Sequence, residues 1–394
     1  MIKNYFYKFL YNTLYFVLGI RKKRLVFCRE DRIGHQAGGL DVQLHKTIRI
    51  KNKLNINTIF IFYEKENIIA NNYLSKLFKN QIKSFGFKFY SINHKMVMAN
   101  FLYKSIIFFI IKLKTNSRIK FASTDIGRRS NRSFILKSNN HSEICRKLKI
   151  IPDKYICIYS RDNNYLANKF KNRNWDYHDY RNSDINNFKK LSNYIVNDIG
   201  WSVVRIGSDP KEKISWETFG SPRIVDYSFS GFRSEQNDID LISGSNLYFS
   251  NGGGPESVAI ASRRNIIKIN QIPLGDEHLN NFGIWLPKIH KKNNSEKYLT
   301  LTEICKLNLK KGNFAKDYKR EGIDICQNQP VDILHAFQDY LKYKNSAFNE
   351  DEKKIIEKYH EVRRTIFEKW GILKNKNNFI APSFLLKYID LLNF

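Results

Sequence analysis

Short apolar runs alternate with longer amphipathic segments along most of this chain. In its first third, runs of β-branched and aromatic residues are separated by helix-length segments whose apolar positions recur every three or four residues. This pattern predicts strands at residues 24–29, 57–66, 87–93 and 118–123, and helices at 39–54, 70–86 and 98–114. Because parallel neighbours need crossover connections, we expect an α/β domain with a parallel sheet.

A polar, basic stretch then interrupts the alternation, and a second series follows it. Its strands are predicted at 155–160, 201–207, 223–228, 247–251 and 266–274, and its helices at 183–200, 236–245 and 255–264. The last part of the chain shows only helical spacing. We therefore expect two Rossmann-like α/β domains with their active site in the cleft between them. The predicted segments are an amphipathic helix at 1–24, domains at 25–127 and 155–330, a linker at 128–154 and a helical C-terminal tail at 331–394.

A run of three glycines lies between a predicted strand and a predicted helix of the second domain, in the sequence SNGGGPESVAIAS at residues 250–262. Bare backbone lets an anion approach the N–H groups, and Pro255 suits the first helical turn, where the helix dipole is positive. Glu256 is placed to accept a hydrogen bond from a sugar hydroxyl. The alternative is a tight turn whose glycines only supply positive φ angles. Neither the P-loop pattern nor the GxGxxG dinucleotide pattern is present.

Several quoted stretches of the second domain resemble a known family. The runs YHDYRNSDI (177–185), GWSVVRIGS (200–208), the segment 224–260 with its glycine loop, and IIKINQIPL (266–274) are similar to bacterial glycosyltransferases encoded in surface-polysaccharide gene clusters. The resemblance covers roughly residues 155–330 and is weak in the N-terminal half. It implies a GT-B architecture with a nucleotide-sugar donor held mainly by the C-terminal domain.

In such an enzyme the leaving group is a nucleoside diphosphate, whose charge helix N-termini and basic side chains can stabilise. Arg161 and Arg205 follow or end predicted strands and are candidates for this contact, although strand alternation can turn Arg205 away. No DxD-type pair ends a strand, since Asp238 and Asp240 fall in a predicted helix, so we expect metal-independent transfer without a cofactor. The donor-binding candidates are Arg161, Arg205, Asn251, Gly252, Gly253, Gly254, Glu256 and Ser257.

A second glycine-containing stretch, EDRIGHQAGGLDVQL at 30–44, follows the first predicted strand. In a GT-B enzyme this loop faces the donor, so it supplies candidates for the base that deprotonates the acceptor hydroxyl. His35 lies among glycines, and Asp41 follows them. For Asp41 the alternative is a first-turn carboxylate that complements the helix dipole. The catalytic candidates are His35 and Asp41.

The formal net charge of +30, from 67 basic and 37 acidic residues, favours anionic partners. An aromatic segment abuts the basic residues 21–24, which suits either an anionic membrane surface or packing on the protein body. The five cysteines show no metal-site spacing, and no cleavage site follows the first segment, so we expect a cytoplasmic protein peripheral to the inner membrane.

The expected partners are a nucleotide sugar and a lipid-linked or growing glycan. A non-catalytic polysaccharide assembly protein and a nucleic-acid-binding protein are the alternatives; the latter is disfavoured because no recognition motif is present.

Overall fold

The structure is a computed structural model of the 394-residue chain. It describes residues 23–54, 57–64, 69–93, 136, 141–169, 171, 174–216, 223–274, 283–307, 309, 314–367 and 378–393. The segments predicted as a helix at 98–114 and a strand at 118–123, together with nearly all of the amphipathic segment at 1–24, lie outside these residues. The chain divides into two compact units, Met1–Ile135 and Leu136–Phe394, and each is described by itself.

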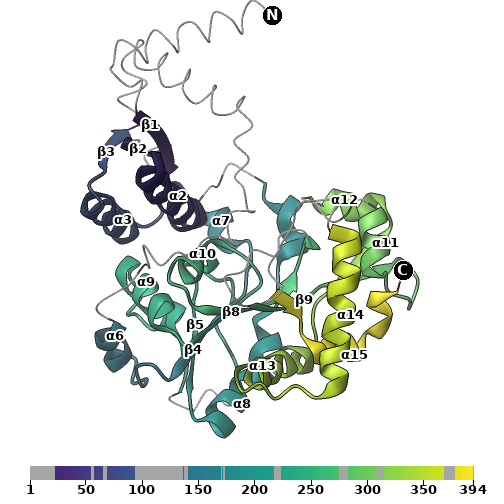
Figure 1. Cartoon of the computed structure of the whole chain (residues 1–394). Helices are drawn as coiled ribbons and strands as arrows, with labels where there is room; N and C mark the ends of the chain where they lie inside the picture. Colours follow the sequence, from purple (N-terminus) through teal and green to yellow (C-terminus); the bar gives the residue numbers. More distant parts are fainter. Residues whose placement is uncertain are drawn as a thin grey trace, which may run out of the picture. The chain divides into compact units, whose positions relative to one another are not determined.

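The N-terminal unit contains a parallel sheet with the strand order β1-β2-β3 (Figure 1). The strands are β1 (Lys23–Arg29), β2 (Asn57–Glu64) and β3 (Lys88–Asn93), and the helices between them are α2 (Leu40–Leu54) and α3 (Asn72–Ser84). Phe60 and Phe62 on β2 are fully buried, and the Asn71 side chain caps α3 by accepting a hydrogen bond from the amide of Leu74 at 2.7 Å. These three predicted strands and two predicted helices are confirmed.

The glycine-containing stretch after β1 is helical rather than a loop. The backbone is already helical at Ile33, and the π-helical segment η2 (His35–Gly39) runs directly into α2. The prediction of a loop here was wrong, because helical geometry tolerates isolated glycines when the neighbouring turns are packed. Short π-helical segments inside α-helices occur frequently at functional sites.

The C-terminal unit is built around a seven-stranded sheet in which every pair of neighbouring strands is parallel. Its strands are β4 (Tyr155–Tyr159), β5 (Ser202–Arg205), β6 (Ile224–Asp226), β7 (Leu247–Ser250), β8 (Asn265–Gln271), β9 (Gly283–Pro287) and β12 (Asn378–Ile380). The strand order is β12-β9-β8-β7-β4-β5-β6. The chain therefore moves outward from β4 to β6, returns to the other side of β4 as β7, and continues outward from there.

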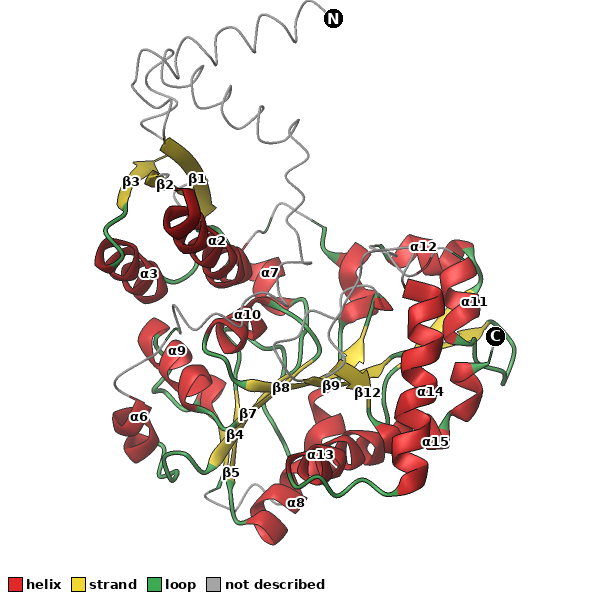
Figure 2. Cartoon of the chain, in the orientation of Figure 1, coloured by secondary structure: helices red, strands yellow, loops and turns green. Residues whose placement is uncertain are grey.

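Helices cover both faces of this sheet. Figure 2 shows α9 and α10 on one side and α8 and α13 on the other. All residues of β5, β7 and β9 are buried, as expected for strands that are covered on both faces. The helices are α6 (His141–Lys147), α7 (Asn164–Lys169), α8 (Lys189–Tyr194), α9 (Glu235–Gly244), α10 (Gly254–Ala261), α11 (Leu301–Lys306), α12 (Ala315–Arg320), α13 (Pro330–Lys344), α14 (Glu350–Phe367) and α15 (Pro382–Lys387).

Short helical segments and a small second sheet complete the unit. The helix predicted at 183–200 is divided into η6 (Ile185–Phe188), α8 and η7 (Ile195–Ile199), and it ends at Gly200, which has a φ of 75°. The segments η5 (Asp176–Arg181), η9 (Tyr227–Phe229) and η13 (Ile389–Leu392) are 3₁₀ helices. The strands β10 (Ile289–Lys292) and β11 (Ile323–Cys326) pair antiparallel.

The sequence did not predict β9, β10, β11 or β12. The chain after residue 331 was expected to be a helical tail, whereas β12 joins the main sheet beside β9. A three-residue strand carries too little pattern to be recognised before its neighbour is known. Among the described helices, none combines the length and apolar composition that crossing a bilayer requires.

Candidate functional site

The strand order of the C-terminal sheet changes direction between β4 and β7, which marks a candidate ligand-binding edge. In open parallel sheets, ligands bind outside the carboxyl ends of the strands at the point where the order reverses. The two strands end level with each other, because Tyr159 pairs with Ser250. Arg161 and the glycine run therefore leave the sheet side by side.

The glycine run forms a bare turn that opens α10. Gly252 has a φ of 85° and Gly253 a φ of 150°, values that favour glycine, and α10 begins at Gly254. A side chain on Gly253 would place its Cβ 2.8 Å from Cε1 of Tyr159, so the backbone packs directly on this ring. The first turn of α10 contains the N–H groups of Gly254 and Glu256, whereas Pro255 has none, and such a helix terminus favours negative charge. Ser257, the next residue, is half-buried.

The Asn251 side chain connects this turn by hydrogen bonds to the segments that contain Arg161 and Arg181. Its Oδ1 accepts a hydrogen bond from the backbone N of Arg161 at 2.8 Å, and its Nδ2 donates to the backbone O of Arg181 at 2.9 Å. The Asn251 side chain is buried. It thus holds three segments together: the ends of β4 and β7, and the 3₁₀ helix η5.

Three cationic side chains come together at this edge: Arg161, Arg181 and Lys288. Arg161 is buried, and its Nη1 donates to the backbone O of His178 and to Oδ1 of Asn182, both at 3.1 Å. Arg181 lies against the glycine turn, with Nη2 3.3 Å from the position that a Cβ on Gly252 would take. Its Nε is buried and has no hydrogen-bond partner within the described part of the chain.

Lys288, the residue after β9, contacts the end of the 3₁₀ helix η5. Its buried Nζ donates to the backbone O of Tyr180 at 2.9 Å and to the backbone O of Asn182 at 2.7 Å. Burial, together with the charge of Arg161, lowers the pKa of Lys288 to about 8. The charged form of this amine is therefore less favourable here than in water.

The positive charge of this site has no carboxylate counterpart in salt-bridge contact. Burial and the neighbouring Arg181 lower the pKa of Arg161. Asp179 acts on Arg161 only weakly, and its Oδ1 accepts hydrogen bonds from Asn163 and Asn182. In the described residues, no carboxylate lies within 4.0 Å of a charged nitrogen of Arg161, Arg181 or Lys288. Buried charges are normally paired, so this arrangement is suited to an anionic ligand.

Glu256 and Arg205, two other predicted donor-binding residues, already have partners in the protein. Oε1 of Glu256 lies 3.0 Å from Nζ of Lys268 on β8, and both side chains are buried. Oε2 of Glu256 is buried without a hydrogen-bond partner in the part of the chain that the structure describes. Nη1 of Arg205 lies 3.2 Å from both carboxylate oxygens of Asp226 on β6. Arg205 thus joins two strands, as the alternation argument allowed, and is not part of the cation cluster.

Of the two predicted bases in the N-terminal unit, His35 is the accessible one. Its side chain is 42% exposed, and its Nδ1 lies 3.4 Å from Oδ1 of Asp31. Arg29 contacts the same carboxylate at 2.6 Å and 3.1 Å. Burial alone would raise the pKa of Asp31, but hydrogen bonds from His35 and Arg29 outweigh it and hold this pKa well below its ordinary range. An ionised Asp31 can fix the tautomer and orientation of the imidazole.

Asp41 occupies a different environment. It lies in the first turn of α2 and is fully buried, with Oδ1 3.3 Å from Nε2 of His45 one turn further along the helix. A carboxylate in this position is satisfied inside the protein. The structure therefore separates the two candidates, since His35 presents its ring to solvent and Asp41 does not.

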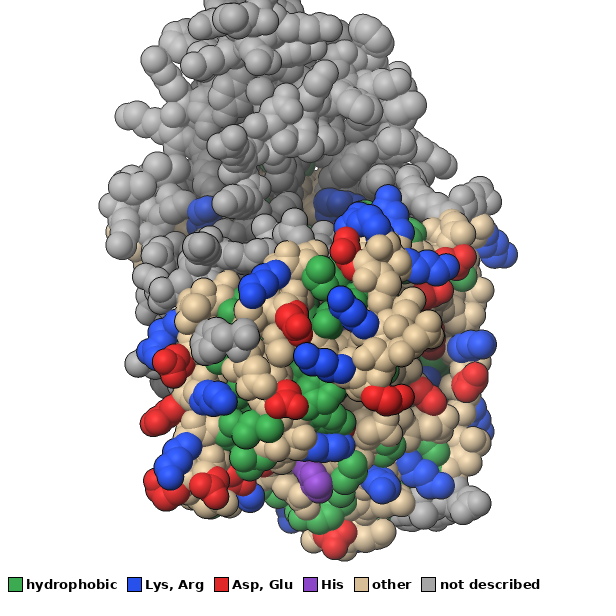
Figure 3. Space-filling model, turned by 90° about the vertical axis from the view of Figure 1, so that its right-hand side faces the viewer, with side chains coloured by type: hydrophobic (Ala, Val, Ile, Leu, Met, Phe, Trp, Pro, Cys, Tyr) green, Lys and Arg blue, Asp and Glu red, His purple; other side chains and the backbone are tan. Residues whose placement is uncertain are grey.

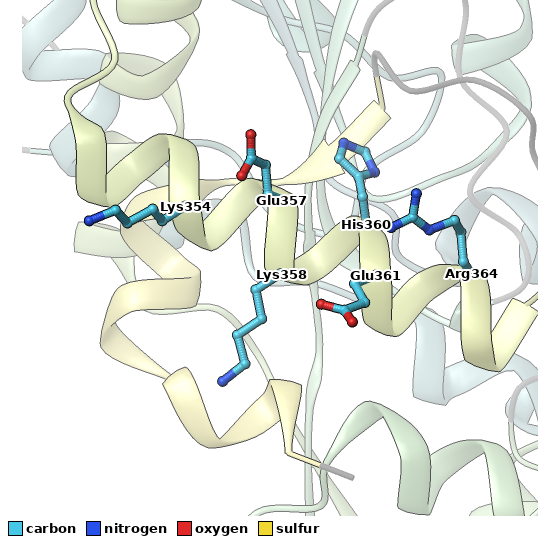
Figure 4. Close-up of a pocket in the computed structure, with 6 residues that line it drawn as sticks. All are labelled: Lys354, Glu357, Lys358, His360, Glu361 and Arg364. Carbon is cyan, nitrogen blue, oxygen red and sulfur yellow. The ribbon is translucent and has the colours of Figure 1, made fainter.

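A hollow of about 670 Å³ lies elsewhere, on the surface of α14. Its described lining comes from this one helix: Lys354, Glu357, Lys358, His360, Glu361 and Arg364. Figure 4 shows these side chains splaying around the helix instead of converging on a common point. The described lining of the hollow therefore lacks the convergent polar groups of a binding site. Among the described residues, no cluster of three or more His, Cys, Asp or Glu side chains is placed to hold a metal ion.

Arg181, Lys288 and Asp31 were not among the residues selected from the sequence. Arg181 lies in the run YRNSD, directly before the helix predicted at 183–200. Lys288 follows a strand that was not predicted. Asp31 stands four residues before His35, and this spacing is the one signal that could have paired them.

No protein-family model matches the chain, and no curated protein and no solved structure matches it either.

Proposed function

We propose that this protein is a glycosyltransferase of GT-B type that moves a sugar from a nucleoside diphosphate donor to a lipid-linked or growing surface glycan. The observation that carries the proposal is the cluster of Arg161, Arg181 and Lys288 beside a glycine turn at the switch point of a parallel sheet. A sugar diphosphate is an anion that needs both cations and backbone amides. The family resemblance of residues 155–330 supports the same activity.

In this reaction the bond between the anomeric carbon and the β-phosphate oxygen breaks, and the electron pair leaves with the diphosphate. The acceptor oxygen forms the new bond to the anomeric carbon and gives its proton to a base. Arg161 and Arg181 would stabilise the charge that develops on the leaving diphosphate, and the first amides of α10 would add partial positive charge. We assign the base to His35, which Asp31 orients.

One face of the C-terminal unit (Figure 3) shows no gathering of basic side chains of the kind that the nucleic-acid alternative requires. Figure 3 shows the face that carries α14, where blue basic side chains and red acidic side chains are interspersed. A nucleic-acid-binding surface is expected to gather basic side chains along one face.

We propose that the protein is peripheral to a membrane and that residues 1–24, nearly all outside the described part, make that contact.

Incubation with a panel of nucleotide sugars tests the proposal. A donor at 100 times its dissociation constant stabilises the folded protein by about 2.7 kcal/mol, which a thermal-shift measurement detects. Release of the nucleoside diphosphate by slow hydrolysis then reports turnover, and His35→Gln should lower this rate without changing donor affinity. Binding without hydrolysis or transfer would point instead to the non-catalytic assembly protein. Failure of every nucleotide sugar to shift the melting temperature would refute the proposal.

A further inference from the structure

Two exposed aromatic rings touch each other next to the cation cluster. Tyr177 is 37% exposed and Phe314 is 41% exposed, and their ring centroids lie 5.7 Å apart. Single exposed aromatic residues are ordinary on protein surfaces, and other examples in this chain include Tyr90 and Phe229. The contact between two such rings beside a charged site is the feature that requires an explanation.

Buried aromatic neighbours hold these rings in place. The ring of Trp175, which is only 4% exposed, stacks on Tyr177 with centroids 6.0 Å apart, and the centroid of the His178 ring lies 4.0 Å from that of Tyr177. Phe314 directly precedes α12, which packs on η5 through the contact of Tyr318 with Tyr180 at 5.3 Å. A ring held this firmly loses little conformational entropy when a ligand binds.

The 3₁₀ helix η5 connects the Tyr177 ring to the cationic side chains. Tyr177 and Arg181 are four residues apart on η5, and a 3₁₀ rise of about 2.0 Å per residue separates them by about 8 Å along the axis. Arg161 donates to the backbone O of His178, the residue next to Tyr177. The helix η5 thus carries the exposed Tyr177 ring, which is inclined by 44° to the Phe314 ring, near one end and the cationic side chain of Arg181 at the other.

We infer that the ring pair of Tyr177 and Phe314 is a stacking platform for the nucleobase of the donor, which makes the site selective for a nucleoside diphosphate over bare pyrophosphate. This inference rests on the proposed function, because it takes the cation cluster as the diphosphate site. Nucleotides combine an anionic diphosphate with a planar aromatic base, and that combination matches both features. Every base has a π-face, so stacking recognises a base without requiring a particular hydrogen-bonding edge.

Isothermal titration of the full chain tests the platform, with inorganic pyrophosphate and the diphosphates of uridine, cytidine, adenosine and guanosine as probes. Tyr177→Ala should weaken binding of the best nucleotide roughly 5- to 150-fold, corresponding to about 1 to 3 kcal/mol of stacking. Its affinity for pyrophosphate should stay at the wild-type value. Tyr177→Phe keeps the ring and should retain nucleotide affinity, and Phe229→Ala removes an exposed ring elsewhere and should have no effect.

The outcomes separate this inference from the proposed function. If Tyr177→Ala binds the nucleotide as tightly as the wild type, or if the wild type prefers no nucleotide to pyrophosphate, the platform is refuted while the diphosphate site stands. If neither pyrophosphate nor any nucleoside diphosphate binds the wild type, both ideas fail. Equal loss of nucleotide and pyrophosphate binding in a folded Tyr177→Ala protein would show that Tyr177 only supports η5, which also overturns the platform.

Discussion

The side chain of Asn251 accepts a hydrogen bond from the backbone N of Arg161 at 2.8 Å, across the boundary between β4 and β7. This contact fixes the glycine turn relative to the first cation of the site. The Nδ2 of the same side chain donates to the backbone O of Arg181, so the same residue anchors the backbone of the second cationic residue. The backbone of the glycine turn and of both arginines is therefore positioned by the fold itself, and preorganised groups are the condition for effective electrostatic stabilisation.

Affinity for a diphosphate should depend on pH through Lys288. Burial and Arg161 lower its pKa from 10.5 to about 8, so the folded protein releases this proton before the unfolded chain does. Stability of the free protein should consequently rise between about pH 8 and pH 10.5, because the unfolded state binds more protons there. A bound anion favours the charged amine, so binding near pH 8 to 9 takes up protons and weakens as the pH rises further.

Titration calorimetry in two buffers of different ionisation enthalpy measures this proton uptake directly. Lys288→Met removes the titrating amine and should abolish the uptake. Lys292→Met, which removes an exposed lysine at the end of β10, should leave it unchanged. Proton uptake of the same size in wild type and Lys288→Met would show that Lys288 does not face the anion.

Gly253→Ala should destabilise the protein and weaken diphosphate binding together. The new Cβ would meet the Tyr159 ring at 2.8 Å, and a φ of 150° is strained for any residue with a side chain. We expect a loss of at least about 1 to 3 kcal/mol in the free energy of unfolding. Gly322→Ala is the matched control, because Gly322 also has a positive φ, of 62°, but no atom lies within 4 Å of its added Cβ.

Chemical denaturation and diphosphate titration of both glycine variants check this prediction. The control should lose about 1 to 2 kcal/mol of stability from the backbone conformation alone and bind normally. A Gly253→Ala protein that is as stable as the wild type would contradict the packing of the turn on Tyr159.

Glu256→Gln should destabilise the fold, because it leaves Lys268 without its carboxylate in a buried position. The two groups lie 3.0 Å apart, with side-chain exposures of 7% and 3%. Removing one member of such a pair destabilises by about 3 kcal/mol, and replacing both with apolar or neutral groups restores much of that. The double variant Glu256→Gln with Lys268→Met should therefore unfold at a higher denaturant concentration than Glu256→Gln alone. An unchanged denaturation midpoint in Glu256→Gln would show that the pair adds nothing to stability.

Much of the C-terminal sheet could be predicted from the sequence because its central strands are continuous apolar runs. The segments at 155–160 and 247–251, and the glycine turn after the second one, carry a strong local pattern. By contrast, β12 has three residues, and only its pairing with β9 defines it. Local patterns report local structure, and strand pairing between distant segments is visible only in the fold.

The sequence likewise predicted only those residues of the candidate site that directly follow predicted strands. Arg161 and the glycines follow predicted strands, so topology alone placed them at the binding edge. Arg181 and Lys288 reach that edge from a 3₁₀ helix and from an unpredicted strand, and no local signal connects them to it. The structure also changes the reading of Glu256, whose partner Lys268 lies on the next strand and is not recognisable from spacing alone.

The most direct test of the central claim is the affinity of Arg181→Ala for a nucleoside diphosphate, compared with wild type by calorimetry. The Arg181 guanidinium has no carboxylate partner among the described residues, so its removal should change the free energy of unfolding by less than about 0.5 kcal/mol. Loss of charge-assisted hydrogen bonds should weaken binding roughly 10- to 150-fold, or about 1.5 to 3 kcal/mol. Arg320→Ala, which removes an equal charge from the exposed surface of α12, should bind like the wild type. A folded Arg181→Ala protein with wild-type affinity would contradict the assignment of this edge as the diphosphate site.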